Sequence, residues 1–437
     1  MLIRRNRLGV WALAALAGVA PAARAAALLA PGAPSKPRVA SSIGSGHDSA
    51  LDRLTTVAWA HQARVAAARA KWAAARARIP LVQQWADPMA EAGLGNFLTL
   101  GGPQLTVSQS IPWPGRLAIV GQEARASAAV ARYDYLAVRD DIREELRRDL
   151  AERYYLAAAT AIDRRAQQRD RDIARIVATL YAVGKAPQAD LLQIQLRQAD
   201  LLEDLTTLGQ ERESNTAKLA WLLGNHGMAG LPAARVAPPQ PRIDASSEQL
   251  LRLGLASAPP VLAAGAAQRA ASAQLALVRF DSLHPRSIAA GVSVGNNMAT
   301  KMDFLGASVG IPLPFIKPER HREATAAARQ ALEAASQAVS QVRLDLEVQI
   351  RDLLAKLHSD DKLLALQHKA LEPEAVLALD TARSAYEVGK TDLTTVLDRD
   401  AELDTVVLRS ARLGADREDA LAGLEQALGR PLPESKP

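Results

Sequence analysis

The sequence predicts a mainly α-helical protein with four β-strands, built from two tandem copies of one structural unit. The composition is 49% hydrophobic with only 4% aromatic residues. Sequence rich in Ala and Leu and mixed with charged residues is typical of long packed helices. Two very long stretches of the chain contain almost no proline. Short sequence elements also return in the same order about 200 residues later, which indicates an internal repeat.

Two landmarks define the repeat. The sequence Ser-Gln-Ser-Ile-Pro-Trp-Pro at 108–114 returns as Ser-Val-Gly-Ile-Pro-Leu-Pro at 308–314, an offset of 200 residues (308 − 108). The sequence Tyr-Ala-Val-Gly-Lys at 181–185 returns as Tyr-Glu-Val-Gly-Lys at 386–390, an offset of 205 residues (386 − 181). Because the order is kept and the offset changes little, the two halves encode the same unit.

The N-terminus has the pattern of an export signal. Three arginines precede an apolar run at 8–20, and Ala23-Arg24-Ala25 resembles a small-x-small cleavage site. The run is too short to cross a bilayer comfortably. We therefore predict a signal peptide at 1–25 and a low-complexity leader at 26–47 in the exported chain.

Several function classes have no support in the sequence. The chain contains no cysteine, which excludes disulfides and lipid attachment at a cysteine. The seven histidines show no ligand spacing, and neither a phosphate loop nor a nucleophile motif occurs. We expect no enzymatic activity, no cofactor and no metal site. The pI is about 9.6, yet blocks of basic and aromatic residues are absent, so no nucleic-acid partner is expected.

The first repeat is expected at 48–224. A helix at 48–78 leads into a strand pair at about 79–112, where Gly and Pro separate short β-prone runs. A helix from 116 to 183 follows, and a return helix ends near Gly224. Apolar residues recur every four positions in the long helix, at Val138, Ile142, Leu146, Leu150 and Tyr154. About 68 residues give a helix of roughly 100 Å, which needs coiled-coil partners.

The second repeat is expected at 247–430, after a Pro-rich connector at 225–246. Its elements are a helix at 247–280, a strand pair at about 286–312 with a turn at Gly295–Asn297, a helix at 318–388 and a return helix ending at Gly429. A short tail at 431–437 completes the chain. No apolar stretch after the signal looks long enough for a membrane-spanning helix, so entry into a membrane would require the strands.

This arrangement resembles the TolC-like outer-membrane efflux family over about 48–430. The Ile-Pro-x-Pro elements correspond to the junctions between strands and helical barrel, at Ile111, Pro112, Pro114, Ile311, Pro312 and Pro314. The resemblance implies a homotrimer in the outer membrane of a Gram-negative cell. Four strands per protomer would form a twelve-stranded β-barrel in lipid, and the helices an α-barrel across the periplasm. The implied partners are a periplasmic adaptor protein and an inner-membrane transporter, expected to be proton-driven.

The resemblance also implies a gate at the periplasmic tips. The positions that are acidic in the family fall on Thr395 and Asp398, so only the second is acidic here, and Asp190 is the candidate in the first repeat. Three copies of Asp398 would form a ring that attracts cations. Alternatively, Asp398 caps its helix or pairs with Arg399 or Lys390. Asp190 alternatively stabilises the positive end of a helix.

The two repeated turns resemble the family's adaptor contacts. These candidate residues are Val183, Gly184, Lys185, Val388, Gly389 and Lys390. A glycine is needed for the tight turn alone, and both lysines could simply be solvated. Recurrence of the triplet at both turns favours adaptor contact.

The sequence therefore predicts a passive exit duct of a tripartite efflux pump that exports small solutes. The stretch 108–116 looks most like members that serve heavy-metal pumps. A type I secretion duct would share the same fold. A periplasmic coiled-coil adaptor or scaffold would also be exported and helical, but adaptors usually carry one helical hairpin. Two hairpins and two strand pairs favour the duct.

Overall fold

A computed structural model describes residues 46–94, 101–226, 228, 231, 245–297, 302–312 and 318–432. The predicted signal peptide and nearly all of the predicted leader lie outside the described residues. Most of the predicted connector and of the C-terminal tail also lie outside them.

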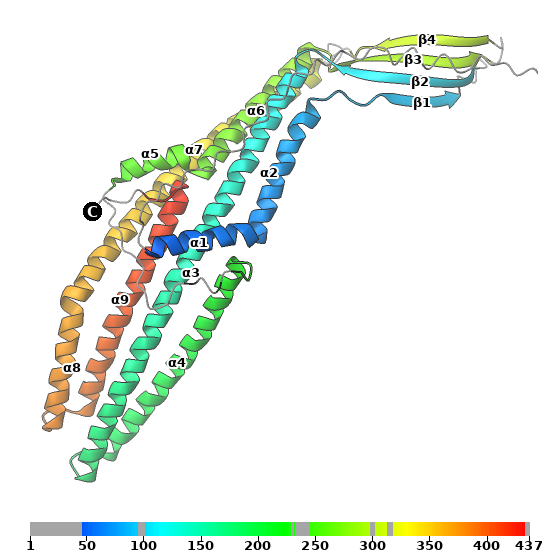
Figure 1. The fold of residues 1–437 in the computed structure, drawn as a ribbon. Helices are drawn as coiled ribbons and strands as arrows, with labels where there is room; N and C mark the ends of the chain where they lie inside the picture. Colours follow the sequence, from blue (N-terminus) through cyan, green and yellow to red (C-terminus); the bar gives the residue numbers. More distant parts are fainter. Residues whose placement is uncertain are drawn as a thin grey trace, which may run out of the picture. The chain divides into compact units, whose positions relative to one another are not determined.

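Both halves of the chain have the same order of elements (Figure 1). The first half contains α1 (Gly46–His61), α2 (Ala63–Val82), β1 (Met89–Leu94), β2 (Gly101–Pro112), α3 (Arg116–Ala182) and α4 (Gln188–Leu222). The second half contains α5 (Ser247–Ser257), α6 (Pro259–Leu283), β3 (Ser287–Asn297), β4 (Met302–Gly310), α7 (Pro318–Leu366), a π-helical turn (Gln367–Leu371), α8 (Glu372–Glu387) and α9 (Leu393–Leu428). The predicted mainly α fold with two tandem repeats and four strands is confirmed.

The first helix of each repeat is broken, where the sequence predicts one continuous helix. Gln62 adopts an extended conformation between α1 and α2. Ala258 does the same between α5 and α6, because Pro259 and Pro260 cannot continue the preceding helix. The strand boundaries also differ from expectation, since α2 continues to Val82 and β3 includes the residues predicted as a turn.

The long helix of the second repeat contains a local irregularity, where the sequence predicts a continuous helix. A π-helical turn separates α7 from α8. Pro373 lies two residues after this turn and has no N–H to donate to the carbonyl four residues earlier. A wider turn accommodates the proline ring while the helix continues.

The four strands form one antiparallel sheet in the order β1-β2-β3-β4. The register places mainly apolar side chains on one face, including Ala90, Ala92, Leu105, Val107, Ile111, Ile288, Val292, Val294, Leu305 and Val309. The opposite face carries mostly small and polar side chains, together with Met89, Met302 and Phe304; the small and polar ones include Glu91, Thr106, Ser108, Ser110, Gly291, Ser293, Gly306 and Ser308. Within the described residues, β1 and β4 each keep one edge without a partner strand.

Helix packing joins the two repeats along α3 and α9. The predicted stripe on α3 supplies Ile142 and Leu146, which are fully buried against α1 and α4. An equivalent cluster in the second repeat contains Ile350, Leu421 and Leu424. The stripe therefore forms a core because α3 has helices on both sides (Figure 1).

Among the described helices, none is by itself long and apolar enough to span a membrane. The bent pair α5 and α6, with 47° between its members, reaches the required length and composition together.

Candidate functional site at the hairpin tips

Each repeat ends in a helical hairpin whose turn has the same geometry. Gly184 and Gly389 both have φ of 72°, in the left-handed region. The N–H groups of Gly184 and Lys185 donate to carbonyls of the preceding helix end at 2.9 and 2.8 Å, and those of Gly389 and Lys390 do the same at 2.9 and 2.8 Å. This is the Schellman pattern, in which glycine ends a helix at low steric cost. The repeated triplet thus has a structural reason in both hairpins.

The side chains of these turns are exposed to solvent. Val183 and Val388 are 64% and 68% exposed. Lys185 and Lys390 are exposed as well. An exposed valine beside a lysine at each tip provides an apolar and a cationic contact for another molecule.

The two tips contact each other through polar side chains. The hydroxyl of Tyr386 on α8 donates to the Asp190 carboxylate on α4 at 3.0 Å. The amide of Gln193 donates to the hydroxyl of Thr394 at 3.3 Å. Burial, followed by the hydrogen bond to Asp190, raises the pKa of Tyr386. Asp190 lies in the first turn of α4, so its helix-stabilising role and its contact with the other hairpin coexist.

Tyr386 was missed as a functional candidate. It is 7% exposed, whereas its repeat counterpart Tyr181 is 45% exposed. Both tyrosines belong to the same repeated motif, so the sequence alone does not show which one bridges the hairpins. Tyr386 is part of a buried apolar cluster, with Val177, Ile194, Leu379, Val396 and Leu397, that joins the hairpins.

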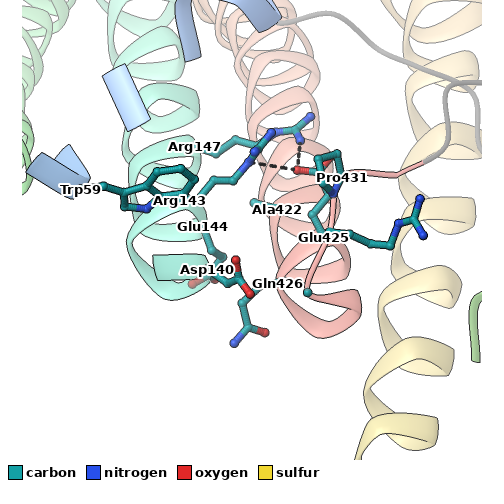
Figure 2. Close-up of a pocket in the computed structure, with 11 residues that line it drawn as sticks. Trp59, Asp140, Arg143, Glu144, Arg147, Ala422, Glu425, Gln426 and Pro431 are labelled. Carbon is teal, nitrogen blue, oxygen red and sulfur yellow. Dashed lines mark ion pairs between the residues drawn. The ribbon is translucent and has the colours of Figure 1, made fainter. Parts of the chain in front are cut away.

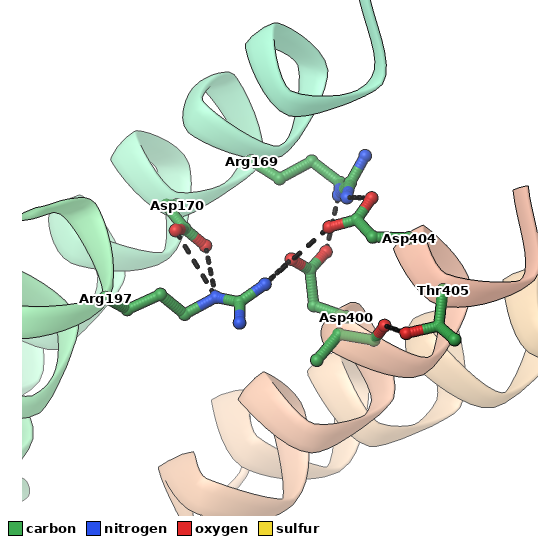
Figure 3. Close-up of polar contacts among 7 residues, drawn as sticks. Arg169, Asp170, Arg197, Asp400, Asp404 and Thr405 are labelled. Carbon is green, nitrogen blue, oxygen red and sulfur yellow. Dashed lines mark hydrogen bonds and ion pairs between the residues drawn. The ribbon is translucent and has the colours of Figure 1, made fainter. Parts of the chain in front are cut away.

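A buried ionic network connects α3, α4 and α9 above the tips (Figure 3). Arg169 binds Asp400 and Asp404, with both N–O distances at 2.5 Å. Arg197 binds Asp400 at 2.9 Å and Asp170 at 3.4 Å. Two arginines therefore face three carboxylates. Burial raises the pKa of Asp170 to about 6, although Arg197 opposes this shift. The members of this network lie on three separate helices, so local sequence patterns do not predict it.

Thr395 and Asp398 have different environments on α9. Thr395 N–H and its hydroxyl donate to Asp392, the N-cap residue, at 2.9 and 2.6 Å. These hydrogen bonds lower the pKa of Asp392. Asp398 is exposed, and within the described residues it has no ion pair. Arg399, its suggested partner, instead pairs with Glu402 at 2.5 Å.

The predicted junction residues lie where strands give way to helices. Ile111 and Pro112 end β2, and Pro114 lies just before α3. Ile311 and Pro312 follow β4. Pro314 lies outside the described residues.

A second polar region lies between α3 and α9, away from the tips (Figure 2). A small pocket of about 130 Å³ is lined by residues that include Trp59, Arg143, Arg147 and Glu425. Arg147 binds Glu418 at 3.0 Å and Glu425 at 2.9 Å. The charges are compensated across the helices, so this region connects the repeats. Among the described residues, no group of side chains could hold a metal ion.

Comparison with known proteins agrees with the predicted resemblance. Residues 250–430, most of the second repeat, match the family model described as outer membrane efflux protein. No match was found among curated proteins. The resemblance of this chain to the outer-membrane efflux family is therefore confirmed, in sequence over its second repeat.

Solved structures extend the likeness to nearly the whole chain. A membrane protein from Pseudomonas aeruginosa has a TM-score of 0.76 at 17% identity, covering 88% of this chain and 91% of that one. The Vibrio cholerae outer membrane protein VceC has a TM-score of 0.72 at 16% identity, covering 88% and 97%. The Neisseria gonorrhoeae MtrE outer membrane channel has a TM-score of 0.67 at 17% identity, covering 87% and 89%. The chain therefore has the fold of outer-membrane channel proteins.

Proposed function

We propose that three copies of this chain form a passive duct through the outer membrane and the periplasm, as the exit part of a tripartite efflux pump. The observation that carries the proposal is a sheet with one apolar face and two open edges. Leu305 and Val309 on that face are 77% and 71% exposed. Such a face suits lipid, and the opposite face, on which serine, threonine and glycine predominate, suits a water-filled lumen.

The open edges require further copies of the chain. Unpaired strand edges cannot remain in lipid, because each unpaired backbone group costs several kcal/mol there. Joining β4 of one copy to β1 of the next gives twelve strands for three copies of four strands. Closure into a barrel leaves no edge.

The helices support the same ring. Contacts within the chain give the order α4, α3, α9, α8 near the tips, so α4 and α8 are the outer helices. Both carry exposed leucines, at Leu192, Leu196 and Leu202 on α4 and Leu377 on α8. Contact of α4 with α8 of the next copy would bury these side chains. A head-to-tail contact of this kind generates a ring when the rotation closes.

The gate follows from the contacts between the two hairpins. Tyr386–Asp190, Gln193–Thr394 and the network around Arg169 and Arg197 hold the hairpins together. Splaying of the tips would break these contacts, beginning with the hydrogen bonds nearest the turns. The exposed Val-Gly-Lys turns would be the points that a periplasmic adaptor grips to start this movement.

Asp398 provides a direct test of charge selection. Three exposed carboxylates near the mouth should favour cations. In a reconstituted channel, Asp398→Asn should reduce the cation-to-anion permeability ratio by about twofold or more. An unchanged ratio would remove Asp398 from the gate.

The proposed function also includes an energy source and a cargo for the pump. A passive duct needs an inner-membrane transporter, for which we propose a proton-driven pump, and the stretch 108–116 favours heavy-metal cations as cargo. Deletion of the gene for this chain should then increase sensitivity to those cations. If the deletion increased sensitivity only to other solutes, the proposed heavy-metal cargo would be contradicted, but the proposed duct would not.

The assembly is tested by fractionating cells and imaging the purified protein by electron microscopy. We expect recovery in the outer membrane as a hollow trimer with a helical part of about 100 Å. A soluble monomer or a solid coiled coil would contradict the duct and favour a periplasmic adaptor or scaffold.

A further inference from the structure

Basic residues are concentrated where the helices meet the sheet. We define the collar as residues 69–88, 113–132, 269–286 and 318–329, the segments that precede β1, follow β2, precede β3 and follow β4 respectively. The collar contains thirteen cations: Arg69, Lys71, Arg76, Arg78, Arg116, Arg125, Arg132, Arg269, Arg279, Arg286, Arg320, Arg322 and Arg329. It contains five acids: Asp87, Glu123, Asp281, Glu319 and Glu323. The rest of the chain carries 40 Lys and Arg (53 − 13) against 42 Asp and Glu (47 − 5), so the excess of positive charge is local.

Most cations of the collar are free to meet another molecule. All except Arg116 are exposed. Among the described residues, the collar cations that bind carboxylates are Arg116 and Arg286, and both bind Asp281, at 2.9 and 3.0 Å. Arg169 and Arg197 near the hairpin tips differ, since they are half-buried and paired with carboxylates. The collar is therefore a surface of uncompensated charge.

The pairing of β2 with β3 ends at the boundary between the apolar face of the sheet and the collar. Trp113 N–H donates to the carbonyl of Arg286 at 3.1 Å, which continues the pairing of β2 with β3. By alternation from Ile111 and Ile288, both side chains belong to the apolar face. The Trp113 and His284 rings are 6.2 Å apart. A tryptophan beside an arginine at the end of an apolar face is typical of the depth at which hydrocarbon meets lipid headgroups.

We propose that the collar binds the anionic headgroups of phospholipids in the leaflet that faces the helices. This inference rests on the proposed function, in which the sheet crosses the membrane. Each cation next to an anionic leaflet strengthens the attraction of the protein to that leaflet by about fivefold at low ionic strength. Salt screens this effect. The collar would thus fix the depth of the sheet in the membrane and select the lipids around it.

The preference can be measured with brominated lipids, which quench tryptophan fluorescence on contact. The full-length protein is reconstituted in vesicles of phosphatidylcholine with increasing phosphatidylglycerol, and quenching by each brominated lipid gives their relative association constant. We expect phosphatidylglycerol to be favoured about fivefold or more at low salt, with the preference falling toward one in 1 M salt. Equal quenching by the two brominated lipids would overturn the proposal that the collar binds anionic headgroups.

Matched variants distinguish an effect of the collar on lipid preference from an effect of the net charge of the protein. Replacing Arg76, Arg78, Arg320 and Arg322 with Gln should reduce the preference at least twofold. Replacing four exposed cations elsewhere, Arg164, Arg165, Arg212 and Lys218, with Gln should leave it unchanged. If both variants lower the preference for phosphatidylglycerol equally, the proposed role of the collar is overturned. Insertion into phosphatidylcholine alone is the control for the duct, because failure to insert there would contradict the proposed function itself.

Discussion

At the residue scale, Asp163 is a buried carboxylate placed near other carboxylates. Its side chain on α3 is 7% exposed. Burial, followed by the charges of Asp204 and Asp404, raises its pKa from 3.8 to about 6. The folded chain therefore binds this proton more tightly than the unfolded chain does. Protonation favours folding, so the penalty for the charged form grows as the pH rises from 3.8 to about 6 and is constant above that.

Asp163→Asn should consequently stabilise the protein at pH 8. The gain should be of the order of 1 kcal/mol per protomer, and it should disappear at pH values below about 4, where the wild-type carboxylate is also neutral. Thermal unfolding at both pH values measures it. Asp134→Asn, which changes an exposed acid of the same helix, is the control. A destabilised Asp163→Asn protein at pH 8 would contradict the assignment.

Tyr386 is the second residue for which the structure predicts a distinct effect. Tyr386→Phe keeps the ring in its apolar cluster and removes the hydrogen bond to Asp190. Loss of one such bond, about 1 kcal/mol, should raise the fraction of open channels about fivefold if the chain forms the proposed duct. Spontaneous conductance in planar bilayers reports this fraction. Tyr181→Phe, at the exposed repeat counterpart, should leave the conductance unchanged, and equal behaviour of the two variants would contradict the role of Tyr386.

At the scale of elements, local sequence patterns predicted the long helices well. The four-residue recurrence along α3 and the glycines at the turns depend on residues close in the chain. The break at Gln62 was missed because no proline or glycine marks it. The pairing of Tyr386 with Asp190 was also not predicted, because 196 residues separate them and only the fold brings the two hairpin tips together. Local patterns do not encode such contacts.

The turn of the second hairpin should depend on backbone conformation alone. A side chain at Gly389 would meet open space, but its φ of 72° is unfavourable for other residues. Gly389→Ala should cost about 1 kcal/mol in unfolding free energy. Gly209→Ala, in open space inside α4, should instead stabilise by up to about 1 kcal/mol. Thermal unfolding compares the two, and equal effects would contradict the need for a left-handed turn at position 389.

At the scale of the whole molecule, the two repeats are joined within one chain by β2 with β3 and by α3, which packs against both α6 and α9. The open edges of β1 and β4 remain for other copies. Local patterns predicted the number of strands, and only the family resemblance implied that they join in one barrel, because pairing between β2 and β3 connects residues 175 (287 − 112) to 196 (297 − 101) positions apart.

The most direct test joins β1 of one copy to β4 of the next by engineered disulfides. The chain has no cysteine, so any disulfide that forms in a variant must come from the added pair. Double variants would place one cysteine at Glu91 or Ala92 and the other at Ala307 or Ser308. Within one chain these strands are about 14 Å apart across the sheet, beyond the reach of a disulfide. Oxidised membranes should therefore contain covalent trimers and no larger species for at least one of the four pairs. Monomers alone for all four pairs, or a ladder that continues past the trimer, would contradict the closed three-copy duct.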